Sequence, residues 1–80
     1  MNYEEKEILK ALKAKYDSKE ATGYEVVIVL VAAVEEGRVR KSNFKHILKE
    51  ILGSELEMLK ALAIAEEYID KSLIDEILGR

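Results

Sequence analysis

Apolar side chains recur along the chain with the spacing of helices that bury one face. From Phe44 to Leu52 they fall at positions i, i+3, i+4, i+7 and i+8 without a gap, which indicates an amphipathic helix. Related patterns recur in four other segments, each bounded by residues that commonly begin or end helices. The 80 residues are enough for a single domain. The sequence therefore predicts an all-α fold, a compact bundle of four to five short helices at about 3–17, 22–36, 42–52, 54–70 and 72–78.

Polar residues mark where these helices begin, and glycines mark where they end. In a capping box, the N-cap side chain and the side chain three residues later each accept a hydrogen bond from the other's backbone N–H. The sequence offers three such pairs: Asn2 with Glu5, Thr22 with Glu25, and Ser54 with Glu57. Ser42 is the expected N-cap of the third helix, and Ser72 that of the last. Single glycines stand at three expected helix ends: Gly37, Gly53 and Gly79.

The segment VVIVLVAAV, from Val26 to Val34, fits two kinds of structure. Its β-branched residues are typical of a buried strand. A helix is favoured because the segment and its flanks have helix length, and because no comparable second run exists that could pair with it as a strand. A helix that is apolar on every side must be covered by its neighbours. We therefore expect a buried, Val-rich second helix at the centre of the bundle.

The last part of the chain contains a change of phase in its apolar pattern. Ile74, Ile77 and Leu78 lie roughly a third of a turn from the preceding stripe, at about 100° per residue. This shift indicates a break near residues 70–72 and a short fifth helix, although one continuous helix that faces a new neighbour would also explain it. The preceding stripe consists of Met58, Leu59, Leu62, Ala65, Ile69 and Leu73.

Three apolar residues of the expected fourth helix fall outside this stripe. They are Leu56, Ile64 and Tyr68. Apolar side chains that gather on a surface mark candidate interaction sites. These three residues are therefore the candidates for self-association, and the partner that they suggest is a second copy of the chain.

Few residues in the chain could carry catalysis or hold a cofactor. There is no cysteine, and the single histidine, His46, is expected to face water on the side of its helix opposite the apolar stripe. A catalytic histidine needs a nucleophile or an orienting acid within reach, and only Glu50, one turn on, could serve. The sequence has no glycine-rich phosphate loop, calcium loop or nucleophile elbow. We expect no catalytic residue, no metal site, no cofactor and no small-molecule substrate.

Charge is distributed unevenly along the chain, whose formal net charge is −3. Residues 37–49 carry five basic residues and no acid, whereas the segments before and after them are acidic. The third helix begins within this basic segment, and the free backbone N–H groups of a helix start favour phosphate. An anion or a nucleic-acid backbone is the ligand that the segment suggests. Its candidate contacts are Arg38, Arg40, Lys41, Ser42, Lys45 and Lys49.

The same basic residues also have a structural interpretation. They could pair with acids of the first or fourth helix, in surface ion pairs worth about 0–1 kcal/mol each. Two further features make nucleic acid a less favoured partner. The whole chain is acidic, and its one phenylalanine, Phe44, belongs to the core stripe and cannot stack on bases. The stretch 64–78 resembles repressor helix-turn-helix segments in its apolar spacing, but Asp75 and Glu76 would face phosphates there.

Caps, glycines, apolar stripes and paired charges all predict the same fold. Such agreement is typical of designed sequences and of proteins from hot environments. The longest uncharged apolar run, Val26–Val34, is too short to cross a bilayer as a helix, which takes about 20 residues. We therefore expect a thermostable, soluble and cytoplasmic domain with a structural or scaffold role. A designed or engineered origin fits this expectation, and a protein-binding module from a thermophilic source is the further alternative.

Overall fold

The computed structural model describes residues 1–80 and contains five α-helices and no strand. The all-α prediction is confirmed, and so is the separate short helix at the end of the chain. The helices pack against one another within 28 × 25 × 19 Å. They are α1 (Tyr3–Asp17), α2 (Gly23–Glu35), α3 (Lys41–Leu52), α4 (Glu55–Ala65) and α5 (Lys71–Leu78).

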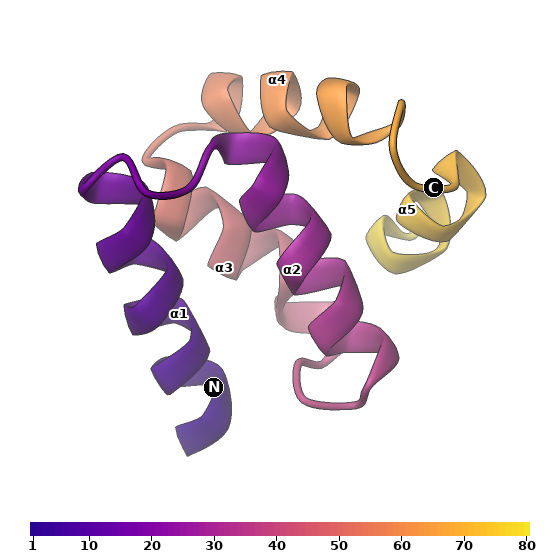
Figure 1. Cartoon of the computed structure of the whole chain (residues 1–80). Coiled ribbons are helices and arrows are strands. Elements are labelled where there is room, and N and C mark those ends of the chain that lie inside the picture. The colour runs from indigo at the N-terminus through magenta and orange to yellow at the C-terminus, as the bar shows by residue number, and fades with distance from the viewer.

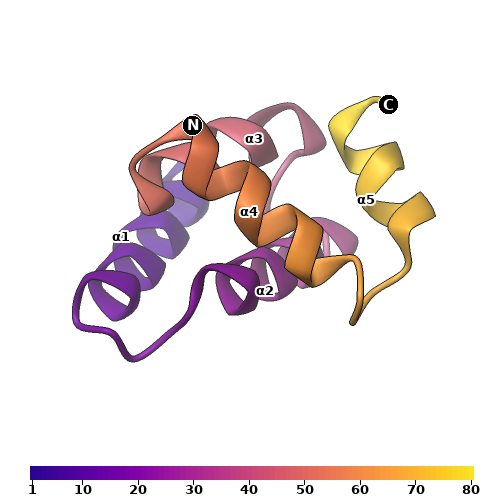
Figure 2. The same ribbon diagram turned by 90° about the horizontal axis from the view of Figure 1, so that it is seen from above.

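The central element is α2, which packs against all four other helices. In Figure 1, α4 crosses above the start of α2, α3 runs behind α2, and α1 and α5 lie on opposite flanks. Figure 2 shows the same crossing from above. The two helices approach closely there, because a Cβ added to Gly23 would lie only 3.2 Å from the Cβ of Ala61. Small residues at both positions therefore determine how near α4 comes to α2.

One hydrophobic core collects buried side chains from every helix. The apolar stripe predicted for α3 is wholly buried, and Phe44 is the largest side chain with no exposed surface. A fully buried aliphatic or aromatic side chain contributes roughly 1.5–3 kcal/mol, so α3 is a main source of stability. Its buried residues are Phe44, Ile47, Leu48, Ile51 and Leu52.

The predicted capping pairs form hydrogen bonds at three helix starts. At α1 both halves of the box are present: Glu5 N–H donates to Asn2 Oδ1 at 2.8 Å, and Asn2 N–H donates to Glu5 Oε1 at 3.0 Å. At α4 the backbone N–H of Glu57 donates to Ser54 Oγ at 3.2 Å. At α2 both the N–H and the hydroxyl of Thr22 donate to Glu25 Oε1.

The predicted N-caps of α3 and α5 are wrong by two residues. Ser42 lies inside α3, whose N-cap is Arg40, because Glu5 binds the backbone N–H of Arg40 and holds that residue extended just before the helix. Ser72 lies inside α5, whose N-cap is Asp70. The carboxylate of Asp70 accepts hydrogen bonds from both the N–H and the hydroxyl of Ser72. The helices themselves begin at Lys41 and Lys71, one residue before the predicted bounds of 42 and 72.

The Val-rich segment is a helix and not a strand, as predicted. Val26, Val27 and Leu30 have no exposed surface, which confirms its central position. It is not enclosed on every side, however, because Val29 is 46% exposed and Ala32 is also exposed. Four short neighbours cover only part of the circumference of α2, so one apolar strip faces solvent.

The fourth helix ends at Ala65, five residues before the predicted boundary. The backbone N–H of Tyr68 bonds to the carbonyl of Ala65 at 2.9 Å, and the chain then turns into α5. The turn brings Ile74 and Ile77 of α5 into the core. Leu59 was expected in the core stripe but is 53% exposed, since it lies at the edge of the buried face of α4.

Candidate functional site

The basic segment predicted to bind an anion is largely engaged in ion pairs with acids of other elements. Arg38 Nη1 lies 3.2 Å from Glu36 Oε1, and Arg38 Nε lies 3.7 Å from Glu4 Oε2. Lys41 Nζ lies 2.8 Å from Glu76 Oε1, which ties the start of α3 to α5. The side-chain contact with Lys41 lowers the pKa of Glu76. These cations therefore stabilise the packing of the helices.

Arg40 pairs with Glu5, the one charged residue that the core encloses. Arg40 Nη2 lies 3.1 Å from Glu5 Oε1, and the backbone N–H of Arg40 donates to Glu5 Oε2 at 2.9 Å. Asn43 Nδ2 donates to the same Oε2 at 3.1 Å, and Asn2 N–H donates to Oε1. Both carboxylate oxygens of Glu5 thus have several donors, which join the start of α1 to the start of α3.

These contacts fix the charge state of Glu5. The side-chain hydrogen bond from Arg40, followed by the backbone N–H groups of Arg40 and Asn2, holds the pKa of Glu5 well below its usual range, although burial alone would raise it. The same pair raises the pKa of Arg40. A carboxylate that stays ionised and already has its partners is a poor general acid or base at neutral pH. Glu5 is therefore an anchor of the fold.

The sequence reasoning identified Glu5 only as half of a capping box and missed its burial. One signal was available. Glu5, Ile8 and Leu12 are spaced three and four residues apart, which places them on one face of a helix. A carboxylate in line with a buried stripe therefore indicates a buried polar contact.

Two cations of the basic segment, Lys45 and Lys49, have no carboxylate oxygen within 4.0 Å of Nζ. Both are exposed on α3, where they lie one turn apart. Ser42 is exposed on the first turn of the same helix, and its side chain makes no hydrogen bond. His46 is exposed as predicted and lines a shallow hollow with Lys49 and Glu50. Of the six candidate contacts, Arg38, Arg40 and Lys41 are thus paired with acids, and Ser42, Lys45 and Lys49 are not.

Lys45 lies at a small groove between α3, α4 and α5, with a volume of about 120 Å³. Four of the lining residues are hydrophobic, and the other two are cations. We call it the lysine groove. It is lined by Lys45, Met58, Leu59, Leu62, Leu78 and Arg80.

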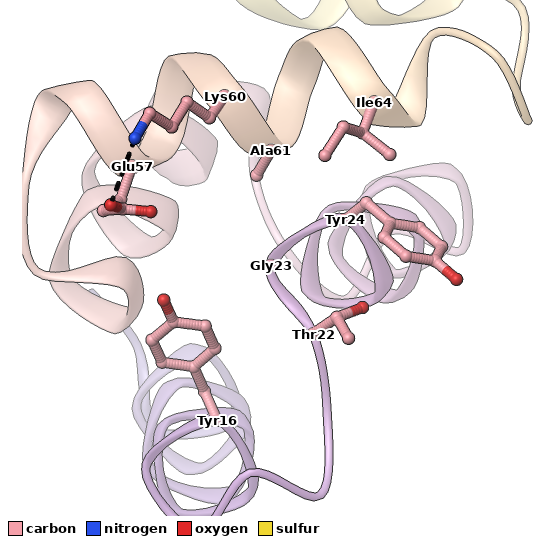
Figure 3. A pocket seen from close by; sticks show the side chains of 8 residues that line it. All are labelled: Tyr16, Thr22, Gly23, Tyr24, Glu57, Lys60, Ala61 and Ile64. Atoms are coloured by element: carbon pink, nitrogen blue, oxygen red, sulfur yellow. Dashed lines mark ion pairs between the residues drawn. The ribbon is translucent and has the colours of Figure 1, made fainter.

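A larger groove of about 340 Å³ opens between the end of α1, the start of α2 and the underside of α4 (Figure 3). Tyr16 and Tyr24 lie on its two sides, and Ile64 projects from α4 beside Tyr24. The ring of Tyr24 stacks on that of Tyr68, with the ring centroids 5.1 Å apart and an interplanar angle of 14°. We call it the tyrosine groove. It is lined by Tyr16, Thr22, Gly23, Tyr24, Glu57, Lys60, Ala61 and Ile64.

The structure separates the three residues predicted for self-association. Ile64 and Tyr68 both lie beside Tyr24, at the tyrosine groove and its edge. Leu56 does not line this groove, and it lies about 80° around α4 from Ile64 at 100° per residue. Tyr24 is the residue that the sequence reasoning missed here.

No group of three or more His, Cys, Asp or Glu side chains is placed to hold a metal ion. None of the five helices combines the length and the apolar character that crossing a membrane takes. No protein-family model matches the chain, and neither the curated proteins nor the solved structures contain a significant match. Inferences about function therefore depend on the two grooves and on the charges around them.

Proposed function

We propose that the protein is a non-catalytic structural domain that self-associates through the tyrosine groove. The observation that carries this proposal is Tyr68, which is 62% exposed and yet stacked on Tyr24 beside the exposed Ile64. Aromatic residues are enriched in the buried centres of protein interfaces. Because the stack already orders both rings, covering them costs less conformational entropy than ordering two free side chains would.

The charges of the tyrosine groove suit a second copy of the chain. Its only charged lining residues are Glu57 and Lys60, whose side chains lie 3.8 Å apart. In a twofold dimer the same patch lies on both subunits, so an acid of one chain can meet a base of the other. Two copies can therefore close over this groove without bringing an excess of like charges together.

Two observations support a role without catalysis. His46 is exposed, and its ring takes part in no side-chain hydrogen bond, so nothing orients it as a base. Glu5 has the most strongly shifted pKa, but it is fully buried and occupied by Arg40, Asn43 and Asn2. Neither of these two residues is thus placed to transfer a proton to or from a substrate.

The first prediction concerns the replacement Ile64→Lys. A lysine there places a charge at the edge of the tyrosine groove, and a charge buried without a partner at an interface is strongly unfavourable. We expect the dissociation constant of the homo-oligomer to rise at least about tenfold, which corresponds to about 1.4 kcal/mol. Sedimentation velocity over a range of protein concentrations measures this directly.

Val29→Lys is the matched control for that replacement. Val29 is also β-branched and is 46% exposed, against 45% for Ile64, but it does not line the tyrosine groove. We expect this variant to associate like the wild type. A wild-type chain that stays monomeric at millimolar concentration would contradict the proposal, as would equal weakening by both replacements.

Anion binding by Lys45 and Lys49 is a second candidate function. It is favoured by the absence of any ion pair at these two side chains, whereas Arg38, Arg40 and Lys41 are all engaged with acids. Lys45 and Lys49 therefore carry the positive charge that remains free for a ligand on α3.

A further inference from the structure

The outer surface of α4 is apolar in a place where the tyrosine groove does not reach. Leu56 is 62% exposed and Leu59, at the edge of the buried face of α4, is 53% exposed, although α4 already supplies Met58 and Leu62 to the core. A helix with apolar residues on both faces is normally covered on both. Leu59 also lines the lysine groove, so this uncovered strip runs into a concave site.

We propose that the lysine groove binds an acidic amphipathic helix from a partner protein. The inference rests on the second candidate function, because it assigns the anion that Lys45 and Lys49 would meet. The groove holds about 120 Å³. Sites for small molecules usually measure roughly 300–1,000 Å³, so this one fits a single aliphatic side chain of a larger partner.

The charges at the groove require acids on that partner. Arg80 is not free, because its Nη2 lies 3.3 Å from Asp75 Oδ1 and 3.7 Å from Glu66 Oε1. Lys45 and Lys49 are free, exposed and four residues apart on α3. Carboxylates spaced by one helical turn on a partner helix would match their separation.

The apolar and basic rows converge on the turn at Gly53, which joins α3 to α4. The step from Lys45 to Lys49 leads along α3 toward Gly53, and the step from Leu59 to Leu56 leads along α4 toward Gly53 as well. A partner helix could therefore place its apolar stripe on the leucines and its acids on the lysines. This is the helix-in-groove mode of recognition, and the fold has no strand edge that would favour an extended peptide.

A nucleic acid fits the same surface less well. The lining residues of the lysine groove include no aromatic side chain on which a base could stack. Phosphates could approach Lys45 and Lys49, but they would leave Leu56 and Leu59 uncovered. The apolar part of the surface thus distinguishes a protein helix from a polyanion.

Fluorescence anisotropy with the full chain tests the inference at low and at high salt. The probe is a labelled 20-residue peptide that carries leucines at i, i+3, i+4 and i+7 and glutamates elsewhere. We expect it to bind the wild type and to bind the double variant Lys45→Glu/Lys49→Glu roughly tenfold more weakly, because attraction is replaced by repulsion. We expect Leu59→Ser to weaken binding as well, and to do so at both salt concentrations.

The matched control is Lys6→Glu/Lys10→Glu, since these lysines are also exposed, one turn apart and without an ion pair, but lie on α1. This control should bind the acidic peptide nearly as the wild type does. A peptide with lysines in place of glutamates should bind the Lys45→Glu/Lys49→Glu variant better than it binds the wild type.

Three outcomes would overturn the inference. If an oligothymidylate binds through Lys45 and Lys49 while the acidic peptide does not, anion binding stands and the helical partner is wrong. If neither probe binds, or if the control variant loses as much affinity as the double variant, both the inference and the second candidate function are wrong. Self-association through the tyrosine groove is measured separately and is unaffected by either result.

Discussion

At the scale of single residues, Glu5 has two structural roles at once. Its carboxylate closes the capping box of α1 and also receives Arg40 and Asn43 from α3. Two carboxylate oxygens offer about four acceptor positions, so one side chain can satisfy donors from two helices. A buried charge is costly unless it is paired and hydrogen-bonded. The burial of Glu5 is therefore tolerable only while the starts of α1 and α3 stay together.

The replacement Glu5→Gln should destabilise the protein by about 2–4 kcal/mol, because the charge is lost and an amide group then faces backbone and guanidinium donors. The effect should depend on pH. The contacts lower the folded-state pKa of Glu5, so its contribution is complete above about pH 5, begins to fall near the unfolded value of about 4.3, and is lost only as the pH falls through the lowered folded-state pKa. Urea denaturation of both proteins at several pH values measures the difference, which should shrink on acidification.

The control is Glu4→Gln, one residue earlier. Glu4 is exposed and makes one long ion pair with Arg38, so its replacement should change the stability by less than about 0.5 kcal/mol. A stability difference between wild type and Glu5→Gln that stays constant down to pH 2 would show that the charge of Glu5 does not stabilise the fold.

At the scale of elements, the sequence predicted those helix ends at which a glycine takes a backbone conformation that other residues rarely adopt. Gly37, Gly53 and Gly79 each follow a helix with a positive φ, as predicted. The end of α4 at Ala65 has no such residue, and the helix stops there because Tyr68 stacks on Tyr24 and the chain must turn to bury α5. Contacts between residues distant in the sequence thus decide where α4 ends. The spacing of the apolar residues alone could show only that the buried face changes direction near residues 70–72.

Gly53 offers a direct test of a predicted helix end. Its φ of +89° is strained for any residue with a side chain, and a Cβ there would meet no atom within 4 Å. Gly53→Ala should therefore cost about 1–2 kcal/mol from backbone strain alone, seen as a lower midpoint in thermal denaturation. Gly53→Asn should cost much less, because asparagine adopts the left-handed region more readily than alanine does. Equal losses in the two variants would rule out this explanation.

At the scale of the whole molecule, the two grooves lie on opposite flanks of α4. Leu59 of the lysine groove and Ile64 of the tyrosine groove lie about 140° apart around the helix, at 100° per residue. Self-association and partner binding therefore need not compete. The sequence predicted that Leu56, Ile64 and Tyr68 lie off the core stripe, but their division between two flanks depends on the neighbours of α4. Those neighbours are α2 and α3, while Tyr16 of α1 and Leu78 of α5 complete the two grooves, and no local pattern brings these elements together.

If the chain self-associates through the tyrosine groove, its thermal stability must depend on its own concentration. Association stabilises the folded chain by mass action, so a 100-fold increase in concentration adds up to about 2.7 kcal/mol per dimer. About half of this falls to each chain, and 1 kcal/mol shifts the midpoint by roughly 4–8 °C in a domain of this size. The midpoint of the wild type should thus rise by up to roughly 5–10 °C between about 10 μM and 1 mM in calorimetry. Ile64→Lys should show no such rise while keeping its helical circular dichroism, and Val29→Lys should behave as the wild type. A midpoint of the wild type that is independent of concentration would mean that the stacked tyrosines stay exposed in solution.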